Sequence, residues 1–550
     1  MEELKKYFKD KKILVASTSC THIRDHYLKN THPFFQKIFG KILLLDTRIN
    51  FYRYGKEVLN QKIIKIVKNE KPDYILFELG YDEISLETFG KIRKILPNTK
   101  LLVHLGDDNW KFDDFSRYYA LFFDYILVSE KDDSYYKKDG IKNTLFVGGA
   151  NLNMFNPMSI EKKYDVTFIG TPIRDRPDFL RFLIKNNIDV KIFSEGWSRY
   201  PDLKDAWMGF LDENKIKEII NSSKINLNFS KTFIKCKRDT QMKGRIFEVL
   251  ACKSFLLTEY FHGIKQYLDD ADKISFKTKK ELLGKIKYFL KNEKEREKLT
   301  EKLHQKIIKE FVWEKHLEKA FKEIIKRDKI FIHKSLQQIN KKIIYLSEKD
   351  ITTSFKKLKE KIKRYDYICF KKDPIEISPY RNYLQAYSLE KSEKDISCCD
   401  YYVYSNWIGD YMLFMAKRAF HFIPQKDFSM LINLDQLMVK KSFFLKYLNN
   451  FKEAFNGKSF NLINERNTVF VSIPLIKIKN LTVVDYPNMR EAFRMRFVDK
   501  LFSLISQKKI IFSIYPYKLF LYGLLKGRFI IKHLLISLLD SVNWEKLKSF

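Results

Sequence analysis

An alternation of short apolar runs with amphipathic stretches constrains the fold more than any other feature of the sequence. Helix-like stretches such as 56–71 and 84–96 separate the runs. The first series of apolar runs comprises 12–16, 42–46, 74–79, 101–105, 125–129 and 144–147. Short runs of nearly continuous apolarity are typical of strands buried in a parallel sheet. The alternation therefore predicts a doubly wound α/β domain over residues 1–155, with right-handed crossovers.

The pattern pauses at the turn-rich segment 148–163 and then starts again. The second series comprises 165–170, 189–193, 225–229, 255–259 and 273–276, and a polar helical run over 279–330 follows it. We therefore expect a second Rossmann-like domain over 156–330. Open α/β sheets bind their ligands beyond the carboxyl ends of the strands. The groove between the two domains is thus the expected site.

The region 331–550 differs in character. It begins with a strand-like run at 341–347 and a charged helix over 351–365, and then becomes Tyr-rich and irregular. The tail 508–539 combines Phe, Leu and Ile with Lys and Arg at near-helical spacing. Such a stripe packs in a core with its lysines reaching solvent, or lies as a basic helix on an anionic membrane. We favour core packing.

The chain is strongly basic, with a formal charge of 103 − 68 = +35. This excess admits nucleic acid, an anionic membrane surface or a phosphorylated small molecule as a partner. Between residues 279 and 311, however, Lys and Glu alternate at i,i+4 spacing, which is typical of a solvated helix face. Charge alone therefore leaves open a non-catalytic scaffold that binds nucleic acid or another polyanion.

Several classes of protein lose support because their motifs are absent. The six cysteines form no C-x-x-C, which disfavours a zinc ribbon or a disulfide framework. No P-loop, G-x-G-x-x-G, H-E-x-x-H or G-x-S-x-G occurs. The N-terminus is too charged for a signal peptide, and no uncharged run approaches the ~18–20 residues that span a bilayer. We expect a cytoplasmic protein, with peripheral contact at the inner membrane face as an alternative.

Three segments carry candidate functional residues, and the first follows the run 101–105. His104, Asp107, Asp108 and Trp110 cluster where this strand should end. A carboxylate there would face the groove and could orient or deprotonate an acceptor hydroxyl. The alternative is that one of the two aspartates only caps the following helix.

The second segment, 168–180, places Arg174 and Arg176 in a small loop between a strand and a helix. Guanidinium groups and helix N-termini both favour a phosphate oxygen. The alternative is that both arginines lie on the surface and pair with Asp175 and Asp178.

The third segment, 241–263, is the most informative. Lys243, Arg245 and Glu248 stand at the start of an otherwise apolar helix. Such a trio is costly to bury without a counter-ligand, so the two cations would meet a diphosphate and Glu248 would accept hydrogen bonds from sugar hydroxyls. The alternative is an internal Arg245–Glu248 ion pair at i,i+3 spacing.

The order of these segments resembles the group 1 glycosyltransferases, in particular the branch of the CgeB-like spore-maturation proteins. The resemblance covers about 70–325. Its landmarks are DDNWKF (107–112) and the segments 123–143, 149–157, 164–180, 194–197, 220–230, 242–260 and 281–299. It implies a GT-B fold, in which an N-terminal Rossmann-like domain binds the acceptor and a C-terminal one binds a nucleotide-sugar.

The resemblance also implies residue roles. Glu248 resembles the carboxylate that contacts the donor ribose, and Lys243 and Arg245 resemble the cations beside the diphosphate. Many group 1 enzymes carry a second Glu eight positions earlier, where this chain has Thr240. Where the family often has a His-Asp pair, this chain has Asp107 and Asp108, so Asp107 is our choice for an acceptor-side role.

We predict Asp107, Lys243 and Arg245 as catalytic residues. The predicted donor-binding residues are Gly170, Arg174, Arg176, Glu248, Glu259 and Tyr260. Cations and helix N-termini of GT-B enzymes stabilise the leaving diphosphate, so we expect no metal and no cofactor besides the nucleotide-sugar substrate. The expected acceptor is a surface glycan, a lipid-linked sugar or a protein, which points to polysaccharide biosynthesis.

Residues 365–387 faintly resemble the part of a GT-A transferase that holds a metal and a nucleotide. The motif position is KKDP, which leaves only Asp373. One carboxylate between lysines is a poor site for a divalent ion. We expect 331–550 to be an accessory α/β region, a degenerate transferase domain kept for acceptor binding, assembly or membrane contact. The alternative is a two-headed transferase in which this region also binds a donor.

Overall fold

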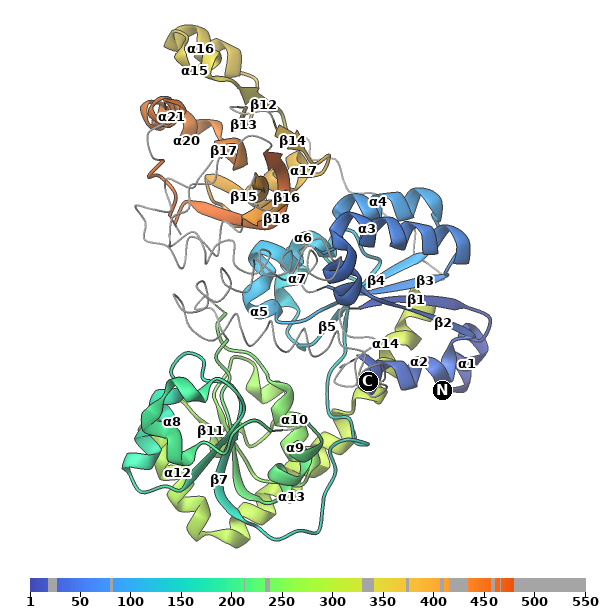
Figure 1. Ribbon diagram of the computed structural model, residues 1–550, viewed down its shortest axis with the longest axis vertical. Helices are drawn as coiled ribbons and strands as arrows, with labels where there is room; N and C mark the ends of the chain where they lie inside the picture. The colour runs from blue at the N-terminus through green and yellow to red at the C-terminus, as the bar shows by residue number, and fades with distance from the viewer. Residues whose placement is uncertain are drawn as a thin grey trace, which may run out of the picture.

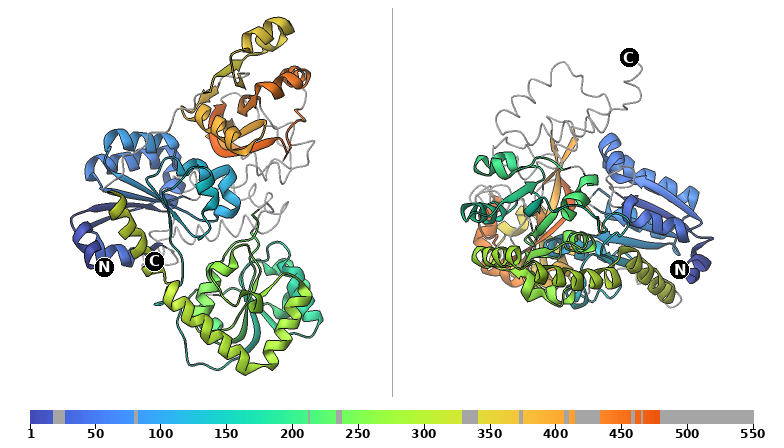
Figure 2. Two further views of the ribbon diagram at one scale, coloured as in Figure 1. Left: turned by 180° about the vertical axis from the view of Figure 1, so that it is seen from behind. Right: turned by 90° about the horizontal axis from the view of Figure 1, so that it is seen from below.

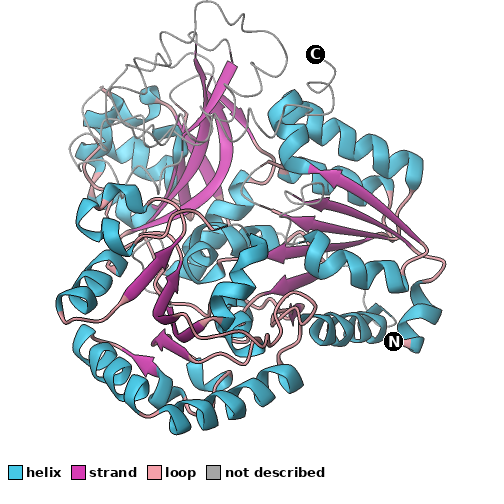
Figure 3. Cartoon of the chain, turned by 60° about the horizontal axis from the view of Figure 1, so that its bottom comes forward, coloured by secondary structure: helices cyan, strands magenta, loops and turns pink. Residues whose placement is uncertain are grey.

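The computed structural model describes residues 1–17, 27–79, 83–211, 213–232, 238–328, 341–371, 375–405, 410–414, 434–456, 460–464 and 466–478 (Figure 1). Asp373 and the basic tail 508–539 lie outside these described residues, so the predictions made for them stay predictions. Three sheets organise the described chain, and Figure 3 shows them as separate groups of strands.

The first sheet has six parallel strands in the order β2-β1-β3-β4-β5-β6. The strands are β1 (Lys12–Ser17), β2 (Lys41–Asp46), β3 (Tyr74–Glu78), β4 (Lys100–Leu105), β5 (Tyr125–Val128) and β6 (Thr144–Phe146). All six predicted apolar runs are confirmed as strands. They are apolar on both sides because successive residues, such as Ile13 and Leu14, are buried in cores on opposite faces of the sheet.

Helices cover both faces of this sheet. One face packs against α1 (Glu2–Phe8) and α2 (His32–Ile38), and the other against α3 (Thr47–Glu70) and α4 (Leu86–Ile95). The remaining helical turns of the first domain are η1 (Tyr27–Thr31), α5 (Asp108–Lys111), η2 (Phe112–Ser116), α6 (Arg117–Ala120) and α7 (Ser134–Lys138). The predicted doubly wound arrangement is confirmed.

The second sheet repeats this topology with five strands in the order β11-β10-β9-β7-β8. The strands are β7 (Tyr164–Ile169), β8 (Val190–Phe193), β9 (Ser223–Asn228), β10 (Leu256–Glu259) and β11 (Ser275–Phe276). The helices are α8 (Arg176–Lys185), η3 (Trp197–Arg199), η4 (Pro201–Ala206), α9 (Glu213–Asn221), α10 (Gly244–Ala251), η5 (Ile264–Gln266), α11 (Ala271–Ile274), α12 (Lys279–Lys291) and α13 (Glu293–Glu310). The predicted strand 273–276 is half as long as expected, because α11 takes its first two residues.

The chain returns to the first domain in α14 (Trp313–Asp328). Leu317 and Phe321 of this helix are buried in the same core as Phe8, and the hydroxyls of Tyr74 and Tyr125 both donate to the Asp328 carboxylate at 2.6 Å. We expected the whole helical run 279–330 to close the second domain, and α14 differs from that expectation. Its apolar stripe was visible in the sequence, but the surface that would cover it was not.

Two segments therefore cross between the domains, and they lie side by side. The Ala150 amide donates to the Phe311 carbonyl at 2.8 Å, and the Trp313 amide donates to the Ala150 carbonyl at 3.0 Å. Gly149 adopts a positive φ of 130°. A Cβ added there would lie 2.4 Å from the Phe311 carbonyl oxygen, so the close approach of the two backbones requires glycine.

The accessory region forms a third, mixed sheet with the order β12-β13-β17-β15-β18-β14, and β16 pairs with β15. Its strands are β12 (Ile343–Leu346), β13 (Tyr367–Phe370), β14 (Ile375–Ile377), β15 (Ile396–Ser405), β16 (Asp410–Phe414), β17 (Leu437–Lys440) and β18 (Thr468–Ile478). Its helices are α15 (Glu348–Thr352), α16 (Phe355–Ile362), α17 (Arg381–Ser392), η6 (Leu434–Gln436), α20 (Lys441–Lys446) and α21 (Leu448–Phe455). The α/β character of this region is confirmed, and the predicted helix 351–365 is divided into α15 and α16.

This third domain packs against the first domain, on the side of α4, and two views agree on this placement (Figures 1 and 2). The Tyr380 ring lies 4.9 Å from the Phe122 ring. Ser378 donates to Glu87 at 2.6 Å, and the Tyr387 hydroxyl donates to Asp139 at 3.2 Å. Within the described ranges, no helix is long and apolar enough to cross a membrane.

Candidate active site

A cavity of about 640 Å³ lies between the first two domains. The first domain contributes residues that follow β4, β5 and β6, and the second contributes the loop before α10 and the start of that helix. The residues that line it include His104, Asp107, Asp108, Asn109, Ser129, Glu130, Gln241, Met242, Lys243, Gly244, Arg245 and Glu248. The volume falls within the roughly 300–1,000 Å³ of ligand pockets, and the groove predicted between the domains is confirmed. Two Rossmann-like domains facing such a cavity form a GT-B fold.

The start of α10 forms the wall contributed by the second domain. Ile246, Phe247 and Leu250 are buried in the core of this domain, which fixes the helix with its first turn at the cavity. The N-cap residue, Lys243, makes no side-chain capping bond, and the first residue, Gly244, is exposed. The unpaired amide groups of a helix N-terminus carry partial positive charge, so this wall favours an anion.

Lys243 stands immediately before this helix. Its ammonium makes no hydrogen bond or ion pair with the residues that the structure describes. Burial lowers the pKa of Lys243 to about 8, an effect that Arg176 reinforces and the charges of Asp107 and Glu130 oppose. A partly desolvated cation without a paired carboxylate is costly. An anion in the cavity would compensate this charge.

Arg245 and Glu248 line the same cavity and contact each other. The Arg245 Nη1 donates to Glu248 Oε2 at 2.5 Å, and both side chains are about three-quarters buried. The internal ion pair that we considered as an alternative is therefore present. It does not fill the cavity, so the pair is a part of the cavity wall.

The two aspartates after β4 differ in their surroundings. Asp107 occupies the N-cap position of α5, but its side chain makes no capping bond; its Oδ1 accepts from Gln241 Nε2 of the second domain at 2.9 Å. Asp108 is buried and accepts from Ser116 Oγ at 2.5 Å and from the Tyr136 hydroxyl at 2.8 Å. Burial raises the pKa of Asp108 to about 6, and its two donors make it a structural carboxylate.

Glu130 lies two residues after β5 and was not singled out in the sequence. Burial and, to a smaller extent, the Asp108 charge raise the pKa of Glu130 to about 7. Hydrogen bonds from the Asn109 side chain and the Met242 backbone amide oppose that shift, as does the Lys243 charge. A glutamate after a strand is common in sequences, and only the folded cavity distinguishes this one.

His104 lies on the same wall, between two strand ends. Its Nδ1 is 3.4 Å from Glu78 Oε1, and its Nε2 is 3.2 Å from Ser129 Oγ. The three residues stand at the carboxyl ends of β3, β4 and β5, with Glu78 and His104 directly paired in register. A carboxylate that accepts from Nδ1 leaves Nε2 able to accept a proton, which is the arrangement of a general base.

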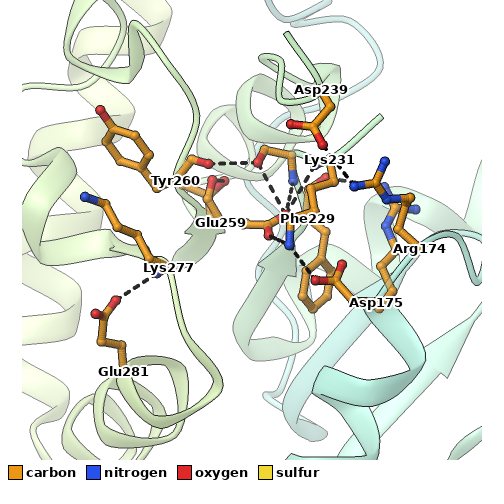
Figure 4. Close-up of polar contacts among 12 residues, drawn as sticks. Arg174, Asp175, Phe229, Lys231, Asp239, Glu259, Tyr260, Lys277 and Glu281 are labelled. Atoms are coloured by element: carbon orange, nitrogen blue, oxygen red, sulfur yellow. Dashed lines mark hydrogen bonds and ion pairs between the residues drawn. The ribbon is translucent and has the colours of Figure 1, made fainter. Parts of the chain in front are cut away.

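Five predicted donor-binding residues lie outside the cavity lining, and Figure 4 shows three of them. Arg174 Nη2 donates to Asp239 at 2.9 Å. Lys231 forms ion pairs with Asp175 and, at 3.1 Å, with Glu259. Glu259 also accepts from the amides of Ser230 and Lys231 at 3.0 and 3.2 Å. The structure thus engages Arg174 and Glu259 in contacts within their own domain.

The other three of the five have structural contacts too. Arg176 donates to the carbonyls of Thr171 and Phe229 at 3.0 and 3.3 Å, and burial lowers its pKa to about 10. The Gly170 carbonyl accepts from Trp197 Nε1 at 2.8 Å. The Tyr260 carbonyl accepts from Ser230 Oγ at 2.9 Å.

The alternative that Arg174 and Arg176 pair with Asp175 and Asp178 at the surface is wrong, because the two aspartates have other partners. Asp175 pairs with Lys231, and Asp178 pairs with Arg181. Arg181 lies three residues after Asp178 on α8, whereas Lys231 and Asp239, the partners of Asp175 and Arg174, come from a remote segment that the local spacing of charges did not identify.

A short segment before α10 holds the two domains together beside the cavity. Arg238 Nη2 donates to Asp113 at 2.8 Å, and its guanidinium lies 5.0 Å from the centre of the Tyr135 ring. Asn109 Nδ2 donates to the Thr240 carbonyl at 2.8 Å. Thr240, which stands where many group 1 enzymes carry a second Glu, thus contributes a backbone contact between the domains.

Among the described residues, no group of three or more His, Cys, Asp or Glu side chains could hold a metal ion. The described cysteines Cys252, Cys369, Cys398 and Cys399 are all buried and free.

Residues 174–322 match the model of a family described as glycosyl transferase-like. No curated protein matches the chain. The match covers most of the second domain and the crossing into α14. The match supports the coarser part of the expected resemblance, namely similarity to glycosyltransferases.

Several solved structures match part of the chain at low identity. HepE from Anabaena, solved in complex with UDP-glucose, has a TM-score of 0.43 and 10% identity over 57% of this chain and 100% of that chain. The β-glucosyltransferase of T4 phage has a TM-score of 0.37 and 13% identity over 58% and 100%. TarM has a TM-score of 0.38 and 12% identity over 48% and 58%. These scores lie below 0.5, so the fold assignment depends on the strand order and the cavity.

Proposed function

We propose that this chain is a glycosyltransferase that transfers a hexose-like unit from a nucleotide-diphosphate-sugar to an acceptor hydroxyl. The observation that carries the proposal is Lys243, a partly buried cation with no ion-pair partner among the described residues, at an uncapped helix start beside a cavity of about 640 Å³. The negative charge of a diphosphate would neutralise the positive charge of this wall. The family match over 174–322 agrees with the proposal.

In this mechanism the donor diphosphate lies against Lys243 and the first amides of α10. The bond between the anomeric carbon and the diphosphate oxygen breaks, and its electron pair leaves with the diphosphate. Fixed positive groups stabilise this developing charge without reorganisation, so no metal ion is required for this step. Glu248 contacts the donor ribose, with Arg245 holding its carboxylate in place.

The opposite wall binds the acceptor. Its hydroxyl oxygen attacks the anomeric carbon, and its proton passes to His104 Nε2, while Glu78 stabilises the imidazolium that forms. Asp107, held by Gln241 from the other domain, orients the acceptor. The acceptor is a surface glycan, a lipid-linked sugar or a protein, and the chain is a CgeB-like enzyme that acts in the cytoplasm or at the inner membrane face.

The test is calorimetric binding of UDP, the nucleotide present in the HepE complexes, to the full chain. We expect the wild type to bind UDP, Lys243→Met to bind it about 10–100-fold more weakly, and Lys298→Met to bind it as the wild type does. Lys298 is a matched control because it is an exposed lysine on α13, away from the cavity.

Two results would contradict the proposal. One is that neither UDP nor any other nucleoside diphosphate binds the wild type. The other is that Lys243→Met binds UDP as tightly as the wild type. Retention on heparin without any nucleotide binding would instead favour a polyanion-binding scaffold.

A further inference from the structure

The accessory domain ends in a small helical tip that lies far from the cavity. Helices α15 and α16 form the outermost end of the molecule in two opposite views (Figures 1 and 2). Leu358 and Ile362 of α16 are buried in the core, so this face of the helix is fixed against the domain. The rest of α16 faces solvent.

The solvent-facing side of α16 is strongly basic. Its cations are Lys356, Lys357, Lys359 and Lys361, and Lys363 and Arg364 follow directly after the helix; all six are exposed, and the only acid among them is Glu360. Over 355–364 the net charge is therefore 6 − 1 = +5. Lys361 pairs with Asp350, and Lys363 lies 3.6 Å from Glu360.

The first three of these lysines, Lys356, Lys357 and Lys359, have no ion-pair partner among the described residues. We call them the tip lysines.

Another lysine-rich helix of the same chain shows the contrast. On α13, Lys302 pairs with Asp270 at 2.8 Å and Lys306 with Asp269 at 2.5 Å, and the sequence of that helix alternates cations with acids. The positive charge of the lysines is therefore balanced by carboxylates on α13 but not on α16. The excess positive charge of α16 is a local property and does not follow from the composition alone.

An exposed aromatic residue stands beside the tip lysines. Phe355, the first residue of α16, is 52% exposed, and Lys359 follows it one helical turn later. Apolar rings set among lysines on a helix are typical of surfaces that lie in the interfacial layer of a membrane. The lysines contact anionic headgroups there, and the ring enters the layer below them.

We propose that the exposed face of α16, formed by Phe355 and the tip lysines, docks on a membrane surface that contains anionic phospholipids. The occupant is a lipid headgroup layer rather than a nucleic acid, because the face is a short convex tip that includes an exposed ring. The inference goes beyond the proposed transferase activity and does not depend on it. Because this domain packs on the first domain, docking would bring the predicted acceptor domain close to the membrane.

The experiment is co-sedimentation of the full chain with vesicles of phosphatidylcholine, with and without phosphatidylglycerol. We expect binding to the anionic vesicles only, weakening as salt rises, because exposed charges are screened over about 10 Å at 0.1 M ionic strength. Each cation near an anionic surface contributes roughly fivefold to affinity. The triple variant Lys356→Glu, Lys357→Glu, Lys359→Glu should lose at least about 100-fold.

The matched control is the triple variant Lys294→Glu, Lys298→Glu, Lys309→Glu, which changes the net charge equally at exposed positions of α13. It should keep vesicle binding. Phe355→Ser should weaken binding several-fold at every salt concentration, because it removes an uncharged contact. All substituted residues are exposed, and an unchanged thermal melt confirms that each variant is folded.

The proposal is overturned if the wild type does not bind anionic vesicles, if the tip triple variant still binds them, or if the α13 control loses binding equally. It is also overturned if the tip triple variant loses affinity for a single-stranded RNA oligonucleotide while the wild type ignores vesicles. That last result would make the tip a nucleic-acid surface.

Discussion

Two basic regions of the second domain look alike in sequence and differ in the structure. At the start of α10, Lys243 faces the cavity and has no paired carboxylate in the part of the chain that the structure describes. At the ends of β7, β9 and β10, the cations Arg174 and Lys231 contact Asp239, Asp175 and Glu259 (Figure 4). Both regions combine cations with a helix or loop at the carboxyl edge of the sheet.

The difference shows which cations are available to a ligand. A cation that already has carboxylate partners gains little from a phosphate, because the partner must be displaced and left unpaired. A cation held beside a cavity with no partner gains the full interaction. Lys243 is therefore a stronger candidate for the donor than Arg174, in agreement with the sequence, in which the segment 241–263 was the most informative.

The largest expected effect tests the paired region. Glu259→Ala leaves the backbone amides of Ser230 and Lys231 without their buried acceptor, while the Lys231 ammonium keeps Asp175 as a partner. Each buried donor left unsatisfied costs about 1–3 kcal/mol of unfolding free energy. Urea unfolding should show this loss. If the UDP affinity of the folded variant falls as well, Glu259 contributes to ligand binding. The distinction between a structural region and a ligand-binding region would then no longer hold.

The second effect tests the cavity region. Lys243→Met should weaken UDP binding by about 10–100-fold, since a hydrogen bond to a charged group contributes about 1.5–3 kcal/mol. Unfolding free energy should stay the same or rise, because a desolvated cation is removed. Calorimetry and urea unfolding of the same sample measure both, and a large loss of stability would make Lys243 a structural residue.

The third effect concerns Glu130 on the opposite wall, whose pKa is raised to about 7. Between its usual pKa, near 4.5, and about 7, the folded chain holds a proton that the unfolded chain has released. The contribution of Glu130 to stability is therefore present at low pH and declines as pH rises through this window, by up to about 3 kcal/mol. Glu130→Gln should unfold at higher urea than the wild type at pH 7.5 but not at pH 5.

The fourth effect is the pH dependence of UDP affinity. The free chain loses the charge of Lys243 as pH rises through about 8, whereas the complex requires it. Affinity should therefore fall by up to about tenfold per pH unit above 8. Lys243→Met should show a flatter profile in titrations at pH 7, 8 and 9, and parallel profiles for the two proteins would assign the titration to another group.

The smallest effect concerns the Arg245–Glu248 pair. Because this i,i+3 pair remains partly exposed, removing it with Arg245→Ala should change the unfolding free energy by only about 0.3–1 kcal/mol. Turnover of a nucleotide-sugar should fall much more than stability does, because Arg245 lines the cavity. Wild-type turnover in this variant would restrict Arg245 to its structural contact with Glu248.

Much of the fold was predictable, because it depends on local patterns. Six apolar runs in the first domain and the runs of the second became strands, since a strand covered on both faces must be apolar at successive positions. The domain against which α14 packs was not predictable. Its stripe of Leu317, Phe321 and Ile324 would suit either domain, and only the core built by α1 and α2 determined which one it covers.

The candidate site was predictable in part for a similar reason. The trio Lys243, Arg245 and Glu248 stands out within one short segment, so the sequence alone identified it. His104 with Glu78 and Ser129, and Glu130 with Asn109 and Met242, are assembled from different strands and domains. Their proximity depends on the register of the sheet and on the packing of two domains. Neither can be inferred from the spacing of residues within a short segment of sequence.

By itself, the sequence determined the two parallel sheets, the groove between them and the charged start of α10, because periodicity and local chemistry are properties of neighbouring residues. Only the tertiary structure decided which of the cations keep a carboxylate partner, which carboxyl groups are desolvated beside the cavity, and where α14 and α16 lie. Charge pairing and desolvation depend on distances between residues remote in the chain, and folding alone sets those distances.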